Sequence, residues 1–128
     1  MYELLAVALG GALGCCCRYG ISRAFAAASV TFPAATLVAN VLAGFLIGLF
    51  TGLDGARAMD ARTKLFLTTG LLGGLSTFST FSMETVRLWQ DGSCLTAGLS
   101  VALNLGLSFA GVAAGLAVVR LLAPGRSL

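Results

Sequence analysis

The sequence predicts an all-α membrane protein with four transmembrane helices, of which the third is broken. The 128 residues are 58% hydrophobic and 10% charged, whereas a soluble domain carries about a quarter charged residues. Four apolar stretches each approach the roughly 20 residues that a spanning helix needs. In the third stretch, a run of hydroxyl side chains follows the apolar residues, which indicates an interruption of that helix.

The four stretches follow one another with short connections and form one predicted domain, residues 1–128. They cover about Glu3–Ala28, Pro33–Leu53, Lys64–Leu88 and Leu95–Leu122. Asp54–Thr63 is the only connection dense in charge, and Gln90–Ser93 is a polar turn.

The third stretch changes character at its midpoint. Gly73 and Gly74 give the backbone a freedom that helix interiors normally avoid, so we expect the break at Gly73–Ser76. Hydroxyl groups then follow at lipid depth on Ser76, Thr77, Ser79, Thr80 and Ser82. Polar structure at that depth is tolerated only where protein buries it or where it lines a wet cavity. We therefore expect something polar to bind or pass here.

Metal binding by side chains and enzyme catalysis have little support. Cys15, Cys16 and Cys17 are consecutive, so on a helix they point in three directions and cannot hold one ion together. We interpret them as small packing residues. The sequence has no histidine and no arrangement of a nucleophile with a base, which argues against an enzyme.

The charge distribution specifies the membrane orientation poorly. The net charge of +3 is spread over the ends of the stretches and gives no indication of a nucleic-acid partner. Four crossings would place five basic residues on one side and three on the other: Arg57, Arg62, Lys64, Arg120 and Arg126 against Arg18, Arg23 and Arg87. Because the positive-inside rule needs a larger bias, insertion in both orientations is an open alternative.

Small and polar residues recur at every fourth position, and residues four apart share one helix face. The rows are Gly10, Gly14 and Arg18; Thr36, Asn40, Gly44, Gly48 and Gly52; and Ser100, Asn104 and Ser108. For the glycines we favour close helix packing. The Asn40 amide is costly in hydrocarbon without partners, and it fits interhelical hydrogen bonding and the wall of a polar pathway equally well.

The remaining ionisable groups lie near the ends of the stretches. We favour Glu84 pairing with Arg18 or Arg23 near the interface, and the alternative is an arginine that gathers anions at a vestibule. Phe78 and Phe81 stand among hydroxyls. The face of an aromatic ring attracts cations and its edge attracts small anions, but three-residue spacing also fits ordinary helix packing.

Three motifs together resemble one known family. They are GGLSTFSTFSMET at 73–85, GGALGCCCRY at 10–19 and TLVANVLAGFLIG at 36–48. With them the chain resembles the Fluc/CrcB fluoride channels along essentially its whole length. The resemblance implies a passive fluoride-selective channel in the bacterial plasma (inner) membrane, which lowers cytoplasmic fluoride. It also implies an antiparallel, dual-topology homodimer with two pores.

The resemblance also implies roles for individual residues. The fluoride pore would be lined by Thr36, Asn40, Phe78, Ser79, Thr80, Phe81 and Ser108, and Arg18 would stand at the vestibule. A structural sodium ion on the dimer axis would be held by the backbone carbonyls of Gly73 and Ser76, doubled by the two-fold axis. The implied partners are a second copy of the chain, fluoride and membrane lipid.

The chain departs from the family pattern at three places. Ser76 replaces the more usual threonine, and Ala43 and Gly44 stand in reversed order. Asn104 occupies a position where tyrosine is common, which leaves the part played by the fourth helix open. Two other functions are alternatives. A small multidrug exporter needs an acidic residue midway along the first helix, where this chain has only Glu3 at the tip. A membrane scaffold would be assembled through the glycine rows alone.

Overall fold

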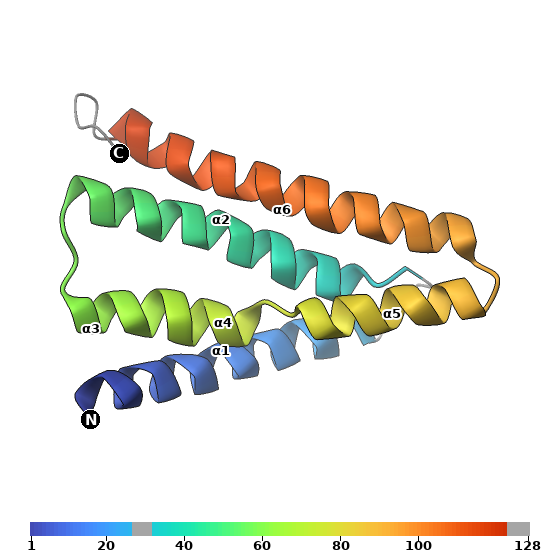
Figure 1. Ribbon diagram of the computed structural model, residues 1–128, viewed down its shortest axis with the longest axis horizontal. Helices are drawn as coiled ribbons and strands as arrows, with labels where there is room; N and C mark the ends of the chain where they lie inside the picture. Colours follow the sequence, from blue (N-terminus) through green and yellow to red (C-terminus); the bar gives the residue numbers. More distant parts are fainter. Residues whose placement is uncertain (27–31, 123–128) are drawn as a thin grey trace.

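The computed structural model describes residues 1–26 and 32–122, and within them all regular secondary structure is helical (Figure 1). Three of the described helices are long and apolar enough to cross a membrane: α1 (Tyr2–Ala26), α2 (Ala34–Ala56) and α6 (Cys94–Leu122). The prediction of an all-α membrane protein is confirmed at this level. The expected end of the first stretch at Ala28, and the basic Arg126, lie outside the described residues.

Shorter helices occupy the chain between α2 and α6. They are α3 (Ala61–Lys64), the π-helix η1 (Leu65–Leu72), α4 (Gly73–Leu75) and α5 (Phe78–Gln90). The backbone stays helical from α3 through α4, with Gly73 at φ −62°, ψ −36°. Ser76 and Thr77 are extended, at φ −72°, ψ 152° and φ −150°, ψ 101°. The interruption therefore lies after the glycine pair rather than at it.

Gly74 has a packing reason instead of the conformational one that the sequence indicated, whereas a Cβ atom on Gly73 would meet open space. A Cβ atom on Gly74 would lie 2.5 Å from the carbonyl oxygen of Gly11 on α1. Glycine at this position thus lets α4 approach the backbone of α1 while remaining helical.

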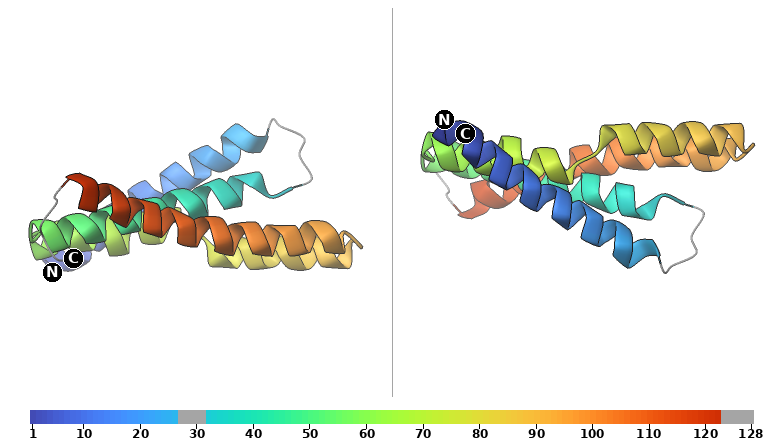
Figure 2. Two further views of the ribbon diagram at one scale, coloured as in Figure 1. Left: turned by 90° about the horizontal axis from the view of Figure 1, so that it is seen from above. Right: turned by 90° about the horizontal axis from the view of Figure 1, so that it is seen from below.

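The helices pack in pairs that change at the interruption (Figures 1 and 2). α2 runs along α6, and η1 and α4 pack against α1, whereas α5 packs against α6. The buried apolar cluster of Ala43, Leu72 and Leu75 joins α2 to the η1–α4 segment. The N-terminus, the α2–α3 connection and the last described turn of α6 lie at the same end of the bundle (Figure 1).

The glycine rows pack helix against helix, as predicted. A Cβ atom on Gly48 of α2 would overlap the carbonyl oxygen of Val112 on α6, and one on Gly14 of α1 would overlap the carbonyl oxygen of Leu71 on η1. Such small residues let membrane helices approach closely, so that van der Waals contact can hold them together.

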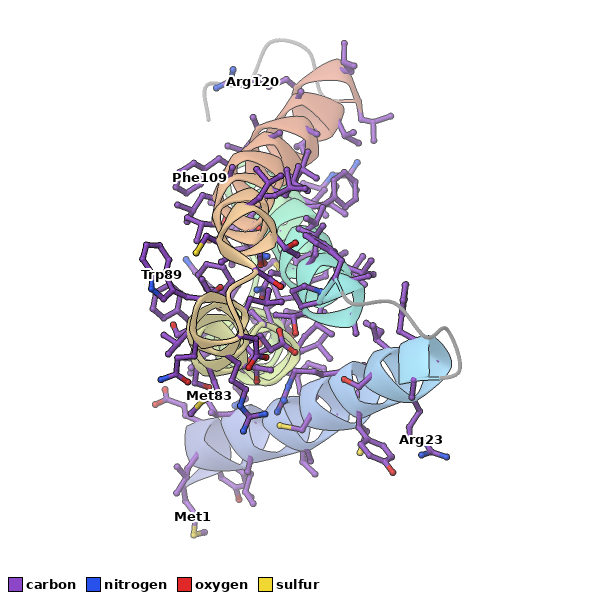
Figure 3. All side chains as sticks on the ribbon, turned by 90° about the vertical axis from the view of Figure 1, so that its right-hand side faces the viewer. Met1, Arg23, Met83, Trp89, Phe109 and Arg120 are labelled. Atoms are coloured by element: carbon purple, nitrogen blue, oxygen red, sulfur yellow. The ribbon has the colours of Figure 1, made fainter. Side chains whose placement is uncertain are left out.

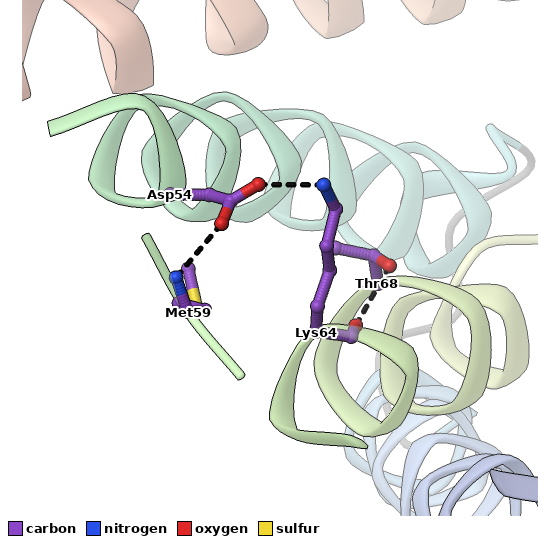
Figure 4. Close-up of polar contacts among 4 residues, drawn as sticks. All are labelled: Asp54, Met59, Lys64 and Thr68. Atoms are coloured by element: carbon purple, nitrogen blue, oxygen red, sulfur yellow. Dashed lines mark hydrogen bonds and ion pairs between the residues drawn. The ribbon is translucent and has the colours of Figure 1, made fainter. Parts of the chain in front are cut away.

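Polar contacts fix the corner between α2 and α3 (Figure 4). Lys64 Nζ lies 2.6 Å from Asp54 Oδ2, and Asp54 Oδ1 accepts a hydrogen bond from the backbone N–H of Met59. Asp60 caps α3 by accepting from the backbone N–H groups of Arg62 and Thr63. Hydrogen bonding to Thr63 is the main cause that lowers the pKa of Asp60 from its ordinary 3.8, because these bonds favour the charged carboxylate.

The turn between α5 and α6 also follows the sequence prediction. α5 ends at Gln90 and α6 begins at Cys94. Gly92 has φ +78°, a left-handed conformation that glycine adopts without steric cost.

Candidate functional site

The interruption at Ser76 and Thr77 is closed on its C-terminal side by a helix cap. Thr77 Oγ1 accepts a hydrogen bond from the backbone N–H of Thr80 at 3.3 Å and donates to Thr80 Oγ1 at 2.8 Å. A threonine hydroxyl at this position supplies a partner that the first turn of a helix otherwise lacks. Thr77 is buried, so the cap of α5 lies inside the protein, while Phe78, the first residue of α5, is exposed.

Asn40 on α2 binds both backbone groups of the interrupted segment. Its Oδ1 accepts from the N–H of Thr77 at 2.8 Å, and its Nδ2 lies 3.4 Å from the carbonyl oxygen of Thr77. The same Nδ2 donates to Asn104 Oδ1 on α6 at 3.0 Å. Of the two interpretations left open by the sequence, interhelical hydrogen bonding is therefore present, and Asn40 lines a cavity as well.

This cavity has a volume of about 430 Å³ and lies at the interruption, between α2, the η1–α4 segment, α5 and α6. Six expected site residues line it, together with Asn104: Asn40, Gly73, Ser76, Phe78, Phe81 and Ser108. The Oγ atom of Ser108 is buried and has no hydrogen-bond partner within the described chain. The cavity is thus mostly apolar, with a few polar groups that could orient a small ligand.

The two phenylalanines of the run contact each other at this cavity. Their ring centroids are 5.5 Å apart, and the ring planes are tilted by 55°. Phe81 is 7% exposed, whereas Phe78 is 74% exposed in the single chain. Phe81 therefore lines the cavity and is buried by its own chain. Phe78 also lines the cavity but lies on the surface of the single chain.

Thr36 and Thr80 are separated from the other expected pore residues. They line a second cavity of about 260 Å³, together with Ser22 and Glu84. The Oε2 atom of Glu84 is buried and has no partner within the described residues. Ser79 is exposed, and its hydroxyl lies 3.5 Å from Thr77 Oγ1.

The favoured pairing of Glu84 with an arginine is wrong. Arg18 Nε donates instead to the carbonyl oxygen of Gly74 at 3.0 Å, and a cation is stabilised at this helix end by the unpaired carbonyls. Arg23 lies near the far end of α1 and points away from the bundle (Figure 3). Within the described part of the chain, the only ion pair is Lys64–Asp54.

The sequence did not reveal how Thr77 and Asn104 contribute. Thr77 appeared only as one of several hydroxyls, and nothing in the run distinguished the helix cap. Asn104 shares its face with Ser100 and Ser108, and that row meets the Asn40 row because α2 packs along α6. The four-residue spacing could have signalled the contact only if the pairing of these two helices had been known.

Fold and site together define a class: a small helical membrane protein in which an extended segment, bound by an amide side chain, opens onto an uncharged cavity. Residues 5–116 match the family model described as CrcB-like protein, Camphor Resistance (CrcB), and the chain belongs to this family. The resemblance inferred from the three motifs is thereby confirmed.

Several curated relatives carry the name fluoride-specific ion channel FluC. The chain is 43% identical to the one from Rhizobium johnstonii over 126 residues, which cover 96% of this chain and 100% of the relative. It is 44% identical to the one from Cereibacter sphaeroides over 122 residues, covering 92% and 94%. It is 43% identical to the one from Ruminiclostridium cellulolyticum over 117 residues, covering 90% of each chain.

Proposed function

We propose that this protein is a fluoride-selective channel that lets fluoride leave the cytoplasm passively, down its electrochemical gradient. The observation that carries the proposal is the cavity at the interruption. Amide and hydroxyl groups of Asn40, Asn104 and Ser108 meet the rings of Phe78 and Phe81 there, and the lining carries no formal charge. The name of the relatives supports fluoride as the ion.

The mechanism rests on replacing the water that surrounds fluoride. Neutral N–H and O–H donors can hydrogen-bond a small anion, and the positive edge of an aromatic ring adds weak attraction. A fixed cation at mid-pore would hold the ion too long, because conduction requires sites that release as well as capture. The unpartnered hydroxyl of Ser108 can donate to an ion without breaking a bond within the chain.

We propose that α3, η1, α4 and α5 together cross the membrane once, as the third of four crossings in chain order. α5 has 13 residues, and η1 and α4 have eight and three, so neither half reaches the roughly 20 residues that a span needs. Joined through Ser76 and Thr77, the two halves run from one end of the bundle to the other (Figure 1).

We propose further that two copies form an antiparallel homodimer with two pores. Gly73, Ser76, Phe78 and Ser79 are exposed in the single chain, although irregular backbone inside a membrane must be covered by protein or water. A second copy in the opposite orientation would provide this cover, and two-fold symmetry would then produce two equivalent pores. The weak charge bias of the sequence is compatible with insertion in both orientations.

A structural sodium ion fits the residues proposed to hold it. The carbonyl groups of Gly73 and Ser76 stand where the first half-helix ends, and helix C-termini carry partial negative charge. Carbonyl oxygens are ligands that hard cations accept. At the same helix end, the carbonyl oxygen of Gly74 accepts a hydrogen bond from the cationic Arg18 side chain. When bound, sodium would supply positive charge that holds the two half-helix ends of a dimer together.

The remaining roles follow from the same proposal. Thr36, Thr80 and Ser79 would extend the pathway beyond the first cavity, and Arg18 would stand at the vestibule while it binds the Gly74 carbonyl. The protein would act in the bacterial inner membrane.

Flux from sealed liposomes tests the function. Purified protein is reconstituted in liposomes loaded with potassium fluoride and potassium chloride, a potassium ionophore is added, and both halides are followed with external electrodes. Fast fluoride release without chloride release is expected, with protein-free liposomes as the control. Release of both halides would contradict selectivity. Absence of any release would favour a scaffold, and proton-driven uptake of an organic cation would favour an exporter.

A further inference from the structure

Four groups on three elements form a continuous chain of hydrogen bonds, which we call the amide relay. It consists of the Ser100 carbonyl, the Asn104 side chain, the Asn40 side chain and the Thr77 backbone. Asn104 Nδ2 donates to the Ser100 carbonyl oxygen at 3.1 Å, and Asn104 Oδ1 accepts from Asn40 Nδ2 at 3.0 Å. Asn40 Oδ1 then accepts from the N–H of Thr77 at 2.8 Å.

The polarity of the relay is fixed at both ends. A backbone carbonyl can only accept, and a backbone N–H can only donate. Asn104 must therefore turn its Nδ2 toward Ser100 and its Oδ1 toward Asn40. This in turn makes Asn40 present Nδ2 to Asn104 and Oδ1 to Thr77. Flipping either amide would place two donors or two acceptors against each other.

Burial makes this polarity consequential. Asn104 is 4% exposed and Ser100 is 0% exposed, so little water reaches this end of the relay, although Asn40 and Asn104 also line the cavity. A buried donor or acceptor left without a partner pays its full desolvation cost. The Asn40 Nδ2 group would lose its 3.0 Å acceptor if the Asn104 amide were removed, which would free the Asn40 amide to rotate away from Thr77.

We propose that Asn104 is a positioning residue that orients the Asn40 amide and thereby holds the extended backbone at Thr77. One Asn40 hydrogen is occupied by Asn104, and the other makes the longer, 3.4 Å contact with the Thr77 carbonyl. An anion entering the cavity can take that second hydrogen while the bond to Asn104 stays in place. This last consequence rests on the proposed function, whereas the orientation of Asn40 does not.

Hydrogen exchange at the Thr77 amide tests the relay, measured residue by residue on the full chain in detergent micelles. Asn104→Leu removes both hydrogen bonds of the side chain at similar volume. Asn104→Thr keeps the polarity, because its hydroxyl can donate to the carbonyl four residues before it and accept from Asn40. Ser100→Ala is the matched control, since it keeps the carbonyl and removes only an unpartnered hydroxyl.

Asn104→Leu is expected to speed exchange at Thr77 by about tenfold or more, with the central amides of α2 and α6 unchanged. Asn104→Thr should give a smaller increase, and Ser100→Ala none. If the leucine variant does not fold, the threonine variant is compared with Ser100→Ala, and only the former should lose protection at Thr77. Unchanged exchange in the leucine variant, equal exchange in the leucine and threonine variants, or equal loss in Ser100→Ala would overturn the proposal.

Fluoride flux from liposomes gives a second measurement on the same variants. We expect Asn104→Leu to slow fluoride release by about tenfold, because a misoriented Asn40 no longer offers its free hydrogen, and Asn104→Thr to slow it less. If the wild-type protein carried no fluoride, the proposed function would fail, and exchange at Thr77 would still decide the role of Asn104.

Discussion

At the scale of single residues, most polar side chains near the interruption bind the protein's own backbone. Asn40 binds Thr77, Arg18 binds the carbonyl of Gly74, and Thr77 caps α5. These groups replace the hydrogen bonds that a continuous helix would make for itself, which are obligatory where water is absent. Ser108 differs, because its buried hydroxyl has no partner within the described chain. This expected pore residue could therefore donate to an ion without losing a hydrogen bond inside the protein.

The two phenylalanines provide the residue-scale prediction. Replacing a ring by isoleucine in Phe81→Ile or Phe78→Ile keeps an apolar side chain but removes the positive ring edge. If each edge stabilises the passing ion by roughly 1.4 kcal/mol, fluoride release from liposomes should slow about tenfold in either variant. Gel filtration in detergent should show the same elution profile as the wild type, at the size of the proposed dimer.

Trp89→Ile is the control for this prediction, because Trp89 is an exposed aromatic residue on the same helix, α5, and points outward (Figure 3). Its substitution should leave fluoride release unchanged. If both phenylalanine variants released fluoride at the wild-type rate, the ring edges would have no role in conduction.

At the scale of helices, the interruption lets one stretch of chain pack against two different partners. η1 and α4 pack against α1, and α5 packs against α6. A straight helix would follow one neighbour along its length, whereas the extended residues Ser76 and Thr77 redirect the chain between the two. The close approach of α2 to α6 through glycine brings the Asn40 and Asn104 rows within hydrogen-bond distance.

The α2–α6 contact predicts opposite effects for two glycine substitutions. Gly48→Ala forces a methyl group into the Val112 carbonyl and should destabilise the protein by about 2 kcal/mol. Gly98→Ala on α6 meets open space in the single chain and should stabilise it by about 1 kcal/mol, because alanine favours helix. Unfolding titrations in detergent would measure both. A Gly48→Ala variant as stable as the wild type would contradict the close contact.

The cap of α3 predicts a pH dependence. The pKa of Asp60 is lowered by its hydrogen bonds to Thr63 and Arg62, so its contribution to stability is present above its ordinary pKa of 3.8. That contribution is lost as the pH falls through the lower pKa of the folded state. Asp60→Asn keeps an acceptor oxygen but cannot titrate, so its melting temperature should fall less than that of the wild type on acidification below pH 3.8. If the melting temperatures of the wild type and Asp60→Asn fell by the same amount on acidification, the charged form of Asp60 would not stabilise the cap of α3.

At the scale of the whole molecule, the single chain leaves its functional segment uncovered. Phe78 is 74% exposed beside the buried Phe81, and Gly73 and Ser76 are exposed as well. Lipid cannot satisfy irregular backbone, which is why we propose that a second copy covers this face. An antiparallel second copy could present the same segment at the same depth, because Ser76 and Thr77 lie near the middle of the stretch from α3 to α5.

The antiparallel dimer predicts a mixed orientation in the membrane. Tags on either terminus should each be accessible to impermeant labels from both faces, because the sequence has only a small basic bias. The measurement is labelling of intact and permeabilised cells, with a protein of fixed orientation as the control. A single orientation for all copies would rule out the antiparallel arrangement.

Several parts of the site could be predicted from the sequence and others could not. The hydroxyl run and the four-residue rows identified the segment and the side chains that gather at it, because periodicity reports which residues share a face. The pairing of Glu84 with an arginine was mispredicted, since Arg18 lies near the Gly74 carbonyl only once α1 packs on α4. The expected break at Gly73–Ser76 included Ser76, but the helical conformation of the glycines and the extended conformation of Thr77 were beyond local propensity.

Composition and spacing by themselves determined that this chain is an apolar helical protein with a polar segment in its third stretch, and the resemblance of three motifs indicated the CrcB family. Those properties depend on hydrophobicity and on which residues are near in sequence. The tertiary structure decided which polar groups pair, namely Asn40 with Thr77 and Asn104, and Arg18 with Gly74. The physical reason is that a hydrogen bond depends on distances of about 3 Å between atoms, and packing between helices far apart in the chain sets those distances.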